Sequence, residues 1–257
     1  MNRGGERTLL TVDRGNTTLD CRLMILRDEQ RMAVRRARLS DAGAEALEDF
    51  LAGASVHAAA GCTVVAGGLD ATVDVLRRRA IDLRIAGRDL PCPLAIGYRD
   101  ARELGVDRWV AAVAARERYG DALVVDCGTA FTMGVVRRDG SYQPGPIGPG
   151  LGTLTRALAE RAPALPQFDR REPDSWPPEG TLDAVRAGVG RGFVRSIESL
   201  ARELLAAAGC GPGEPVRIAT GGDAAIFVAM ASPGWIERPE LVHDGLLWLL
   251  ERCVSRS

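Results

Sequence analysis

The sequence predicts an α/β protein made of two similar halves, each with a mixed β-sheet flanked by helices. In the first half, a short apolar strand runs into Asp13-Arg-Gly-Asn-Thr17, and a second apolar strand follows at once. The same pattern returns at Asp126-Cys-Gly-Thr-Ala130. After each pair of strands, helical and strand-like segments alternate, as in α/β folds. We place the boundary near residue 118, which gives domains of residues 1–118 and 119–257.

The first half carries two strands joined by a Gly-Asn turn, and then alternating helices and strands. Apolar β-favouring runs predict the strands, and apolar residues at helical spacing predict the helices. The expected strands cover residues 8–12, 19–26 and 62–66, the last closing on Gly67-Gly68; the expected helices cover residues 41–53, 70–80 and 104–118.

The second half repeats this order and ends in helices. A turn at Arg138-Asp-Gly140 leads into a Pro/Gly-rich segment over residues 144–150. Residues 163–180 are Pro-rich and are expected to be irregular. The expected strands cover residues 122–125, 131–136 and 216–220, the last followed by Gly221-Gly222 and a helix; further helices are expected over residues 151–162, 182–208 and 241–252.

Composition excludes several kinds of chemistry. Among 257 residues there is no lysine, so a P-loop lysine or Schiff-base lysine cannot exist here. Only His57 and His243 represent histidine, which disfavours Ser-His-Asp hydrolysis and multi-histidine metal sites; we expect both on the surface or in packing. The formal net charge is −1, so no overall field favours nucleic acid or an anionic membrane.

The expected compartment is the cytoplasm. The six cysteines include no C-x-x-C pair, and the N-terminus does not resemble a signal peptide. No apolar run approaches the ~18 residues that a membrane-spanning helix needs.

The two repeated turns have the residue types of a phosphate-binding site. Glycine lets backbone N–H groups approach a phosphate, and a carboxylate at the strand end, Asp13 or Asp126, can hold a metal ion beside it. The hydroxyls of Thr17, Thr18, Thr129 and Thr132 are candidate donors to phosphate oxygens. Either turn alone is more simply an ordinary hairpin. Two at equivalent places favour a nucleotide site, and so an ATP-dependent small-molecule kinase.

Five motifs in order resemble the type III pantothenate kinase family of the acetate and sugar kinase/Hsp70/actin superfamily. They are D-x-G-N-T at Asp13, G-x-D-R at Gly105, D-x-G-T-A at Asp126, I-x-P-G at Ile147 and T-G-G at Thr220. The resemblance extends to the C-terminal segment 241–246. It implies duplicated ribonuclease H-like (actin/hexokinase-type) domains. It also implies phosphorylation of pantothenate to 4′-phosphopantothenate, the first step of coenzyme A biosynthesis, with ATP and Mg²⁺.

The resemblance also implies residue roles. The first phosphate turn would run from Asp13 to Asp20. Asp107 would be the general base, Arg108 would orient the substrate, and Asp126 would bind a monovalent cation, K⁺ or NH₄⁺. Thr181 would reach the substrate of a neighbouring subunit, which implies a homodimer, with no nucleic-acid or membrane partner. The implied ATP-binding residues are Asp13, Arg14, Gly15, Asn16, Thr17, Thr18, Thr129, Gly221 and Gly222, and the implied pantothenate-binding residues are Tyr98, Gly105, Val106, Asp107, Arg108 and Thr181.

The chemistry of Asp107 and Arg108 agrees with these implied roles. Phosphoryl transfer needs a carboxylate placed to receive the proton of the attacking hydroxyl, and arginine binds a substrate carboxylate in bidentate fashion. The plain alternative is that both residues start an exposed helix, where the helix dipole favours aspartate. Within the motif set we prefer the functional interpretation.

Four departures from the family pattern leave alternatives open. Gly134 stands where the family usually has an Asp, so a polar group near the site is missing; Ala66-Gly67-Gly68 replaces a Ser-Ser pair; Ala101 replaces a proline; and the segment 144–150 is altered. The chain could therefore be a divergent paralogue that phosphorylates another small alcohol. It could also be a non-catalytic regulator that binds nucleotide.

Overall fold

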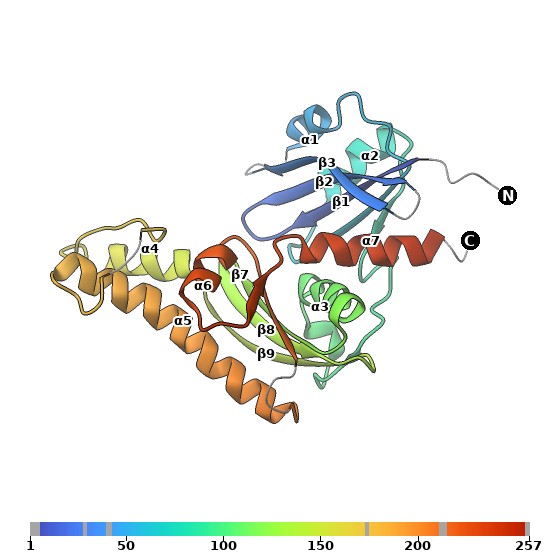
Figure 1. The fold of residues 1–257 in the computed structure, drawn as a ribbon. Coiled ribbons are helices and arrows are strands. Elements are labelled where there is room, and N and C mark those ends of the chain that lie inside the picture. The colour runs from blue at the N-terminus through green and yellow to red at the C-terminus, as the bar shows by residue number, and fades with distance from the viewer. Residues whose placement is uncertain (1–5, 28–29, 40–42, 173–174, 211–214, 255–257) are drawn as a thin grey trace. The chain divides into compact units, whose positions relative to one another are not determined.

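The computed structural model describes residues 6–27, 30–39, 43–172, 175–210 and 215–254 (Figure 1). The chain forms two compact units, which are described separately. The first unit comprises Met1–Pro93, Leu104–Ala114 and Val242–Ser257, and the second comprises Leu94–Glu103 and Ala115–Leu241.

The first unit is built on a five-stranded mixed sheet in the order β3-β2-β1-β4-β5. Strands β1, β2 and β3 are antiparallel neighbours, whereas β4 and β5 run parallel to β1. The strands are β1 (Arg7–Arg14), β2 (Leu19–Arg27), β3 (Gln30–Leu39), β4 (Ala58–Thr63) and β5 (Leu83–Ile85), and the helices that contribute to this unit are α1 (Ala44–Phe50), α2 (Asp70–Arg78), the first turns of α3 (Val106–Tyr119), and α7 (Leu241–Val254).

The two faces of this sheet differ in polarity because side chains alternate along a strand. Leu10 and Val12 of β1 join a buried apolar cluster with residues of α1 and α2, including Phe50 and Leu76. The residues between them point to the opposite face. There the β1–β2 register places Thr11 opposite Arg22, and Asp13 opposite Asp20. One face therefore forms the core, and the other carries a row of polar side chains.

Helices α3 and α7 pack closely within the first unit. A side chain at Gly245 of α7 would overlap the backbone carbonyl of Val110 in α3, so only glycine permits this approach. Side chains of α7 reach the polar face of the sheet, since the hydroxyl of Thr11 contacts the ring of His243.

The second unit has a six-stranded sheet in the order β11-β10-β7-β8-β9-β6. Its β9-β8-β7-β10-β11 portion repeats the β3-β2-β1-β4-β5 order, with three antiparallel strands followed by two parallel ones. The strands are β6 (Ala95–Ile96), β7 (Ala122–Cys127), β8 (Ala130–Val136), β9 (Ser141–Pro149), β10 (Val216–Thr220) and β11 (Trp235–Glu237). The predicted fold class is confirmed: two mixed sheets of one topology, each flanked by helices.

Helices α4 (Leu151–Arg161), α5 (Thr181–Ala207) and α6 (Ala224–Met230) belong to the second unit, together with a short 3₁₀ helix, η1 (Ala101–Glu103). The long α5 crosses one face of this sheet (Figure 1). Its Phe193 meets Phe131 of β8 edge to face, with ring centroids 6.1 Å apart, and Phe227 of α6 meets Trp235 at 4.8 Å. These rings anchor the second apolar core.

The structure differs from the predicted elements in three places. The Pro/Gly-rich segment 144–150 lies mostly in β9, which is paired along its length only with β8, since β6 covers just two of its residues. The strand expected over residues 62–66 is β4, an Ala-rich strand that begins earlier and is buried between β1 and β5. Strand β3 and the short strands β5, β6 and β11 were not predicted.

Residues 104–114 and 242–257 pack with the first unit, so the contacts follow no single chain boundary. The predicted division near residue 118 stays a prediction. No helix in the described part of the chain is both long and apolar enough to cross a membrane.

Candidate active site

The first turn joins β1 to β2 as predicted. The N–H of Gly15 donates to the carbonyl of Thr18 at 3.1 Å, which closes a tight hairpin. Asn16 and Thr17 are exposed at its tip, while Gly15 and Thr18 are half-buried. The turn therefore presents its polar groups outward at the end of a strand whose central residues, 9–12, are buried.

Asp13, at the end of β1, lies among polar groups from neighbouring strands. It is opposite Asp20 in β2 and beside Cys62 in β4, whose thiol donates to Oδ1 of Asp13 at 3.3 Å. Burial, and next the charge of Asp107, raise the pKa of Asp13 to about 7. The site thus holds more negative charge than its surroundings neutralise, which favours a cation or a proton there.

Arg14 follows Asp13 and carries the positive charge nearest to it in the turn. Its Nε and one terminal nitrogen are buried without a hydrogen-bond partner among the described residues. A side chain at Gly68 would approach Cγ of Arg14 to 3.0 Å and Oγ1 of Thr63 to 2.7 Å, and Gly67 has φ +65°. The glycines that replace the Ser-Ser pair therefore leave room for Arg14.

Asp107 and Arg108 start α3, and their geometry depends on the glycine before them. The N–H of Arg108 donates to Oδ1 of Asp107 at 2.8 Å. A side chain at Gly105 would lie 2.7 Å from that oxygen, so glycine is needed for this carboxylate position. Burial raises the pKa of Asp107. Arg108 is only 8% exposed, which argues against an ordinary solvent-facing helix start.

The first unit thus brings together two predicted groups that are far apart in sequence, Asp13 with its turn and Gly105–Arg108. Tyr98 belongs to the second unit, on the segment between β6 and η1, and Thr181 is the exposed first residue of α5. No single unit therefore contains the whole predicted pantothenate set.

Sequence reasoning missed a buried polar network beside Asp13. Asp20 lies 3.5 Å from Nε of Arg22 and 3.3 Å from Nε2 of His243, and Arg36 and Arg38 approach its other oxygen. Although burial alone would raise it, hydrogen bonding to His243 and these positive charges lower the pKa of Asp20 to about 2. His243, expected on the surface or in packing, is buried within this network. The only feature of the sequence that drew attention to His243 was the rarity of histidine.

The second turn places Asp126 at the end of β7. The carboxylate lies against Gly221, where any side chain would overlap Oδ1 of Asp126, and Gly221 has φ +91°. Parallel pairing also puts Thr220 directly beside Asp126. The structure therefore brings the predicted Asp126 and Gly221-Gly222 together at one edge of the sheet.

Thr129, on the same turn, is held by backbone contacts. Its carbonyl accepts from the N–H of Gly150 at 3.0 Å and from the hydroxyl of Thr153 at 2.7 Å. A side chain at Gly150 would overlap the carbonyl oxygen of Gly128. The I-x-P-G motif thus ends in a glycine that allows the start of α4 to lie against the second turn. Thr129 itself is exposed.

The absence of a side chain at Gly134 has a structural reason. It is buried in β8, two residues along the same face from Thr132, which is opposite Asp126. Any side chain at Gly134 would overlap the phenol of Tyr142, which is only 3% exposed. The volume of the side chain that the family carries here is therefore occupied by a tyrosine from β9.

Among the described residues, no group of three or more His, Cys, Asp or Glu side chains could hold a metal ion. A cation at Asp126 would therefore depend on one carboxylate together with hydroxyl, carbonyl or ligand oxygens, the donor set that hard cations accept.

The fold recurs in solved structures. The chain superimposes on a conserved Baf-family protein of Campylobacter jejuni with a TM-score of 0.62 and 17% identity, covering 96% of this chain and 99% of that one. A ROK family glucokinase of Streptomyces griseus, solved with glucose and AMPPNP, gives a TM-score of 0.52 at 13% identity, with coverage of 95% and 98%. The protein thus has the duplicated ribonuclease H-like fold.

Sequence comparison identifies the family. The family model of type III pantothenate kinase matches residues 9–203. A type III pantothenate kinase of Alkalilimnicola ehrlichii is 39% identical over 196 residues, which cover 72% of this chain and 77% of that protein. One of Anaeromyxobacter dehalogenans is 31% identical over 254 residues, which cover 95% and 99%. The chain belongs to the type III pantothenate kinase family.

Proposed function

We propose that this protein transfers the γ-phosphoryl group of ATP to the primary hydroxyl of pantothenate, giving 4′-phosphopantothenate. The observation that carries the proposal is the half-buried Asp107 carboxylate, whose position depends on Gly105 and which lies close enough to Asp13 to raise the pKa of Asp13. A carboxylate beside a phosphate turn is the arrangement that phosphoryl transfer needs.

The first turn binds phosphate oxygens in this proposal. The N–H groups of residues 16–18 and the hydroxyls of Thr17 and Thr18 are the proposed donors, and Arg14 contributes its two buried, unpaired nitrogens. A guanidinium in this state favours an anion beside it, because an unpaired buried charge is unfavourable. ATP at this turn would supply that anion. Thr129 and Gly221-Gly222 are the proposed ATP-binding residues of the second unit.

Asp107 acts as the general base. An ordinary aspartate is a weak proton acceptor at neutral pH, whereas the raised pKa of Asp107 brings it closer to the working pH. Its Oδ1 already accepts from the Arg108 N–H, which fixes the carboxylate while Oδ2 receives the proton. Arg108 and Tyr98 would hold the carboxylate and polar groups of pantothenate.

Two cations complete the proposal. Mg²⁺ bound with ATP neutralises charge on the phosphates. Asp126 would ligate a monovalent cation, K⁺ or NH₄⁺, and Gly221 fits this role because any side chain there would overlap the carboxylate. We place the reaction in the cytoplasm, and we keep the functional domains at residues 1–118 and 119–257.

The direct test follows product formation by mass spectrometry with ATP, Mg²⁺, K⁺ and pantothenate. We expect the wild type to form 4′-phosphopantothenate and Asp107→Asn to lose ~10²–10⁴-fold in kcat. Asp74→Asn, the same change on the exposed face of α2, is the matched control and should keep full activity. An inactive wild type refutes the reaction; a fully active Asp107→Asn refutes the base.

Another small alcohol is the second candidate acceptor. Ala101, which replaces the family's proline, lies in η1 close in sequence to Tyr98, so the acceptor pocket differs from the family pattern at this point. ADP release measured over a panel of small alcohols, pantothenate included, distinguishes pantothenate from another alcohol as the acceptor. Faster turnover of another alcohol than of pantothenate would reassign the substrate. Nucleotide binding without turnover of any acceptor would favour a regulator.

We further propose a homodimer in which Thr181 contacts the partner's substrate. Thr181 is exposed at the start of α5. Further along α5, Gly188 and Gly192 border an apolar groove shared with α4, and no atom stands within 4 Å of where their side chains would begin. An open apolar groove on the same helix supports self-association.

Subunit mixing tests this arrangement. Asp107→Asn and Thr181→Val are purified separately and then allowed to exchange subunits. If Thr181 acts on the partner's site, each mixed dimer has one intact site, and the mixture recovers roughly one quarter of wild-type activity. If Thr181 acts within its own subunit, the activity of the mixture stays at the average of the two parents, which would contradict the proposal.

A further inference from the structure

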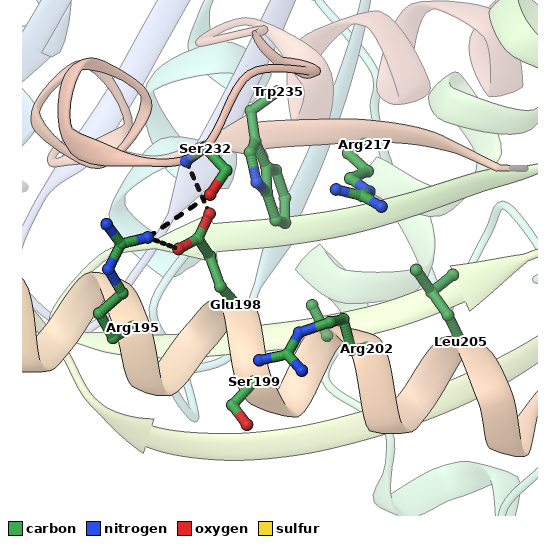
Figure 2. A pocket seen from close by; sticks show the side chains of 9 residues that line it. Arg195, Glu198, Ser199, Arg202, Leu205, Arg217, Ser232 and Trp235 are labelled. Atoms are coloured by element: carbon green, nitrogen blue, oxygen red, sulfur yellow. Dashed lines mark hydrogen bonds and ion pairs between the residues drawn. The ribbon is translucent and has the colours of Figure 1, made fainter. Parts of the chain in front are cut away.

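A cavity of about 400 Å³ lies in the second unit, between a helix and the strands beside it (Figure 2). It is enclosed by α5, β10 and the segment leading into β11. Its lining combines an apolar wall, formed by Ala201, Leu205 and Trp235, with hydrogen-bonding groups at Arg195, Glu198, Ser199, Arg202, Arg217 and Ser232.

The charges around this cavity do not balance. Three guanidinium groups face one carboxylate, and that carboxylate is already used. Glu198 accepts from Nη1 of Arg195 at 2.6 Å with one oxygen and from the backbone N–H of Ser232 at 2.7 Å with the other. Arg202 and Arg217 have no ion pair or hydrogen bond to any described residue. The cavity thus has two guanidinium groups available for a ligand.

A third donor is buried beside them. Trp235 is only 8% exposed, and its Nε1 has no hydrogen-bond partner among the described residues. In Figure 2 the indole lies between Glu198 and Arg217, and it borders the cavity. Buried N–H groups are almost always paired, so an indole N–H left unpaired at a cavity wall indicates a missing acceptor.

We propose that this cavity binds a small organic phosphate, a ligand with a phosphate monoester dianion and a short apolar group. Two arginines match the charge of a phosphate dianion, and guanidinium groups bind phosphate oxygens in bidentate fashion. The indole N–H offers one further donor. The apolar wall would cover the organic part. None of these residues is used by the proposed kinase reaction, so the test of this site does not depend on that reaction.

The indole itself provides a residue-specific test. The chain has four tryptophans, so a ¹H–¹⁵N spectrum of the full-length protein contains four indole signals, and Trp235→Phe identifies the relevant one. We expect phenyl phosphate to move this signal saturably. Phenol, which lacks the charge, should leave it in place, and benzoate, a monoanion, should bind more weakly. Tighter binding of benzoate would overturn the assignment to phosphate.

Substitution of the two arginines completes the test. The double variant Arg202→Gln/Arg217→Gln should bind phenyl phosphate about tenfold or more weakly by calorimetry and by the indole signal. Arg77→Gln/Arg84→Gln removes the same charge from exposed positions in the first unit and should bind as the wild type does. The single variants are measured as well, so that a poorly folded double variant does not decide the outcome. An indole signal that does not move in the wild type, or equal affinity in the arginine variants, would overturn the proposal.

Discussion

The Nε2 atom of His243 lies 3.3 Å from Oδ1 of Asp20, while its Nδ1 lies 2.8 Å from the hydroxyl of Thr11. All three residues are buried. Burial lowers the pKa of His243, so the ring is neutral and its partners set the tautomer. Nε2–H donates to the carboxylate, and Nδ1 accepts from the threonine. This contact ties α7 to the hairpin that carries the first turn.

We predict that His243→Phe destabilises the protein by about 1–3 kcal/mol, because it takes the ring partner from the buried Thr11 hydroxyl and removes one contact of the buried Asp20 carboxylate. Urea unfolding at pH 7.5 measures this. The control His57→Phe changes an exposed ring that accepts a single bond from the Thr8 N–H, so we expect a smaller loss. A His243→Phe variant as stable as the wild type would mean that the network contributes nothing to stability.

Asp13 predicts the pH dependence of stability. Its pKa is raised from 3.8 to about 7 in the folded state, so folding favours the protonated form. The stability that comes from folding with Asp13 protonated is fully present below pH 3.8 and is lost as pH rises through 7. The variant Asp13→Asn cannot ionise at this position and so does not lose this stability. Without nucleotide, the Tm of the variant minus the Tm of the wild type should therefore increase between pH 5 and pH 8.

Thermal unfolding at a series of pH values provides the measurement for Asp13→Asn. Asp74→Asn, whose carboxylate is 64% exposed, should keep a constant difference from the wild type over the same range. A constant difference for Asp13→Asn as well would show that Asp13 titrates normally in the folded protein.

The elements of the fold could largely be predicted because their signals are local. The apolar run before each D-x-G-x turn predicts β1 and β7, and helical spacing predicts α2 and α3 to within a few residues. Duplication of the turns then predicts the repeated sheet. Strand β3 was missed because its exposed surface includes Met32, Val34 and several arginines, without a simple alternation of polar and apolar residues.

Contacts across the chain could not be predicted from these patterns. The bond between Thr11 and His243 joins residues 232 positions apart, and it depends on the face that β1 turns toward α7. The proximity of Asp13 and Asp107 was suggested by the family resemblance and not by spacing. Likewise, Arg202, Arg217 and Trp235 come from three elements that only the folded second unit brings together.

Gly134 illustrates the same limit and gives a third prediction. From sequence it is a lost carboxylate, but in the structure its missing side chain makes room for Tyr142. Gly134→Ala should therefore destabilise the protein by about 1–3 kcal/mol through overpacking. Tyr142→Ala also destabilises by opening a cavity. Measured by urea unfolding, the double variant should lose less than the sum of the two. Additive losses would show that the two positions do not compete for space.

Asp126 gives the last prediction, which concerns the monovalent cation. If its carboxylate is a ligand, Asp126→Asn should abolish the stimulation of kinase activity by K⁺ and lower kcat by about 10- to 100-fold, the effect of losing one charged contact. The measurement is kcat against KCl concentration, with choline chloride holding the ionic strength constant. Asp74→Asn serves again as the exposed control and should retain the K⁺ response. A wild type indifferent to K⁺ and NH₄⁺ would remove the cation from the proposal. An unchanged K⁺ response in Asp126→Asn would place the cation at another site.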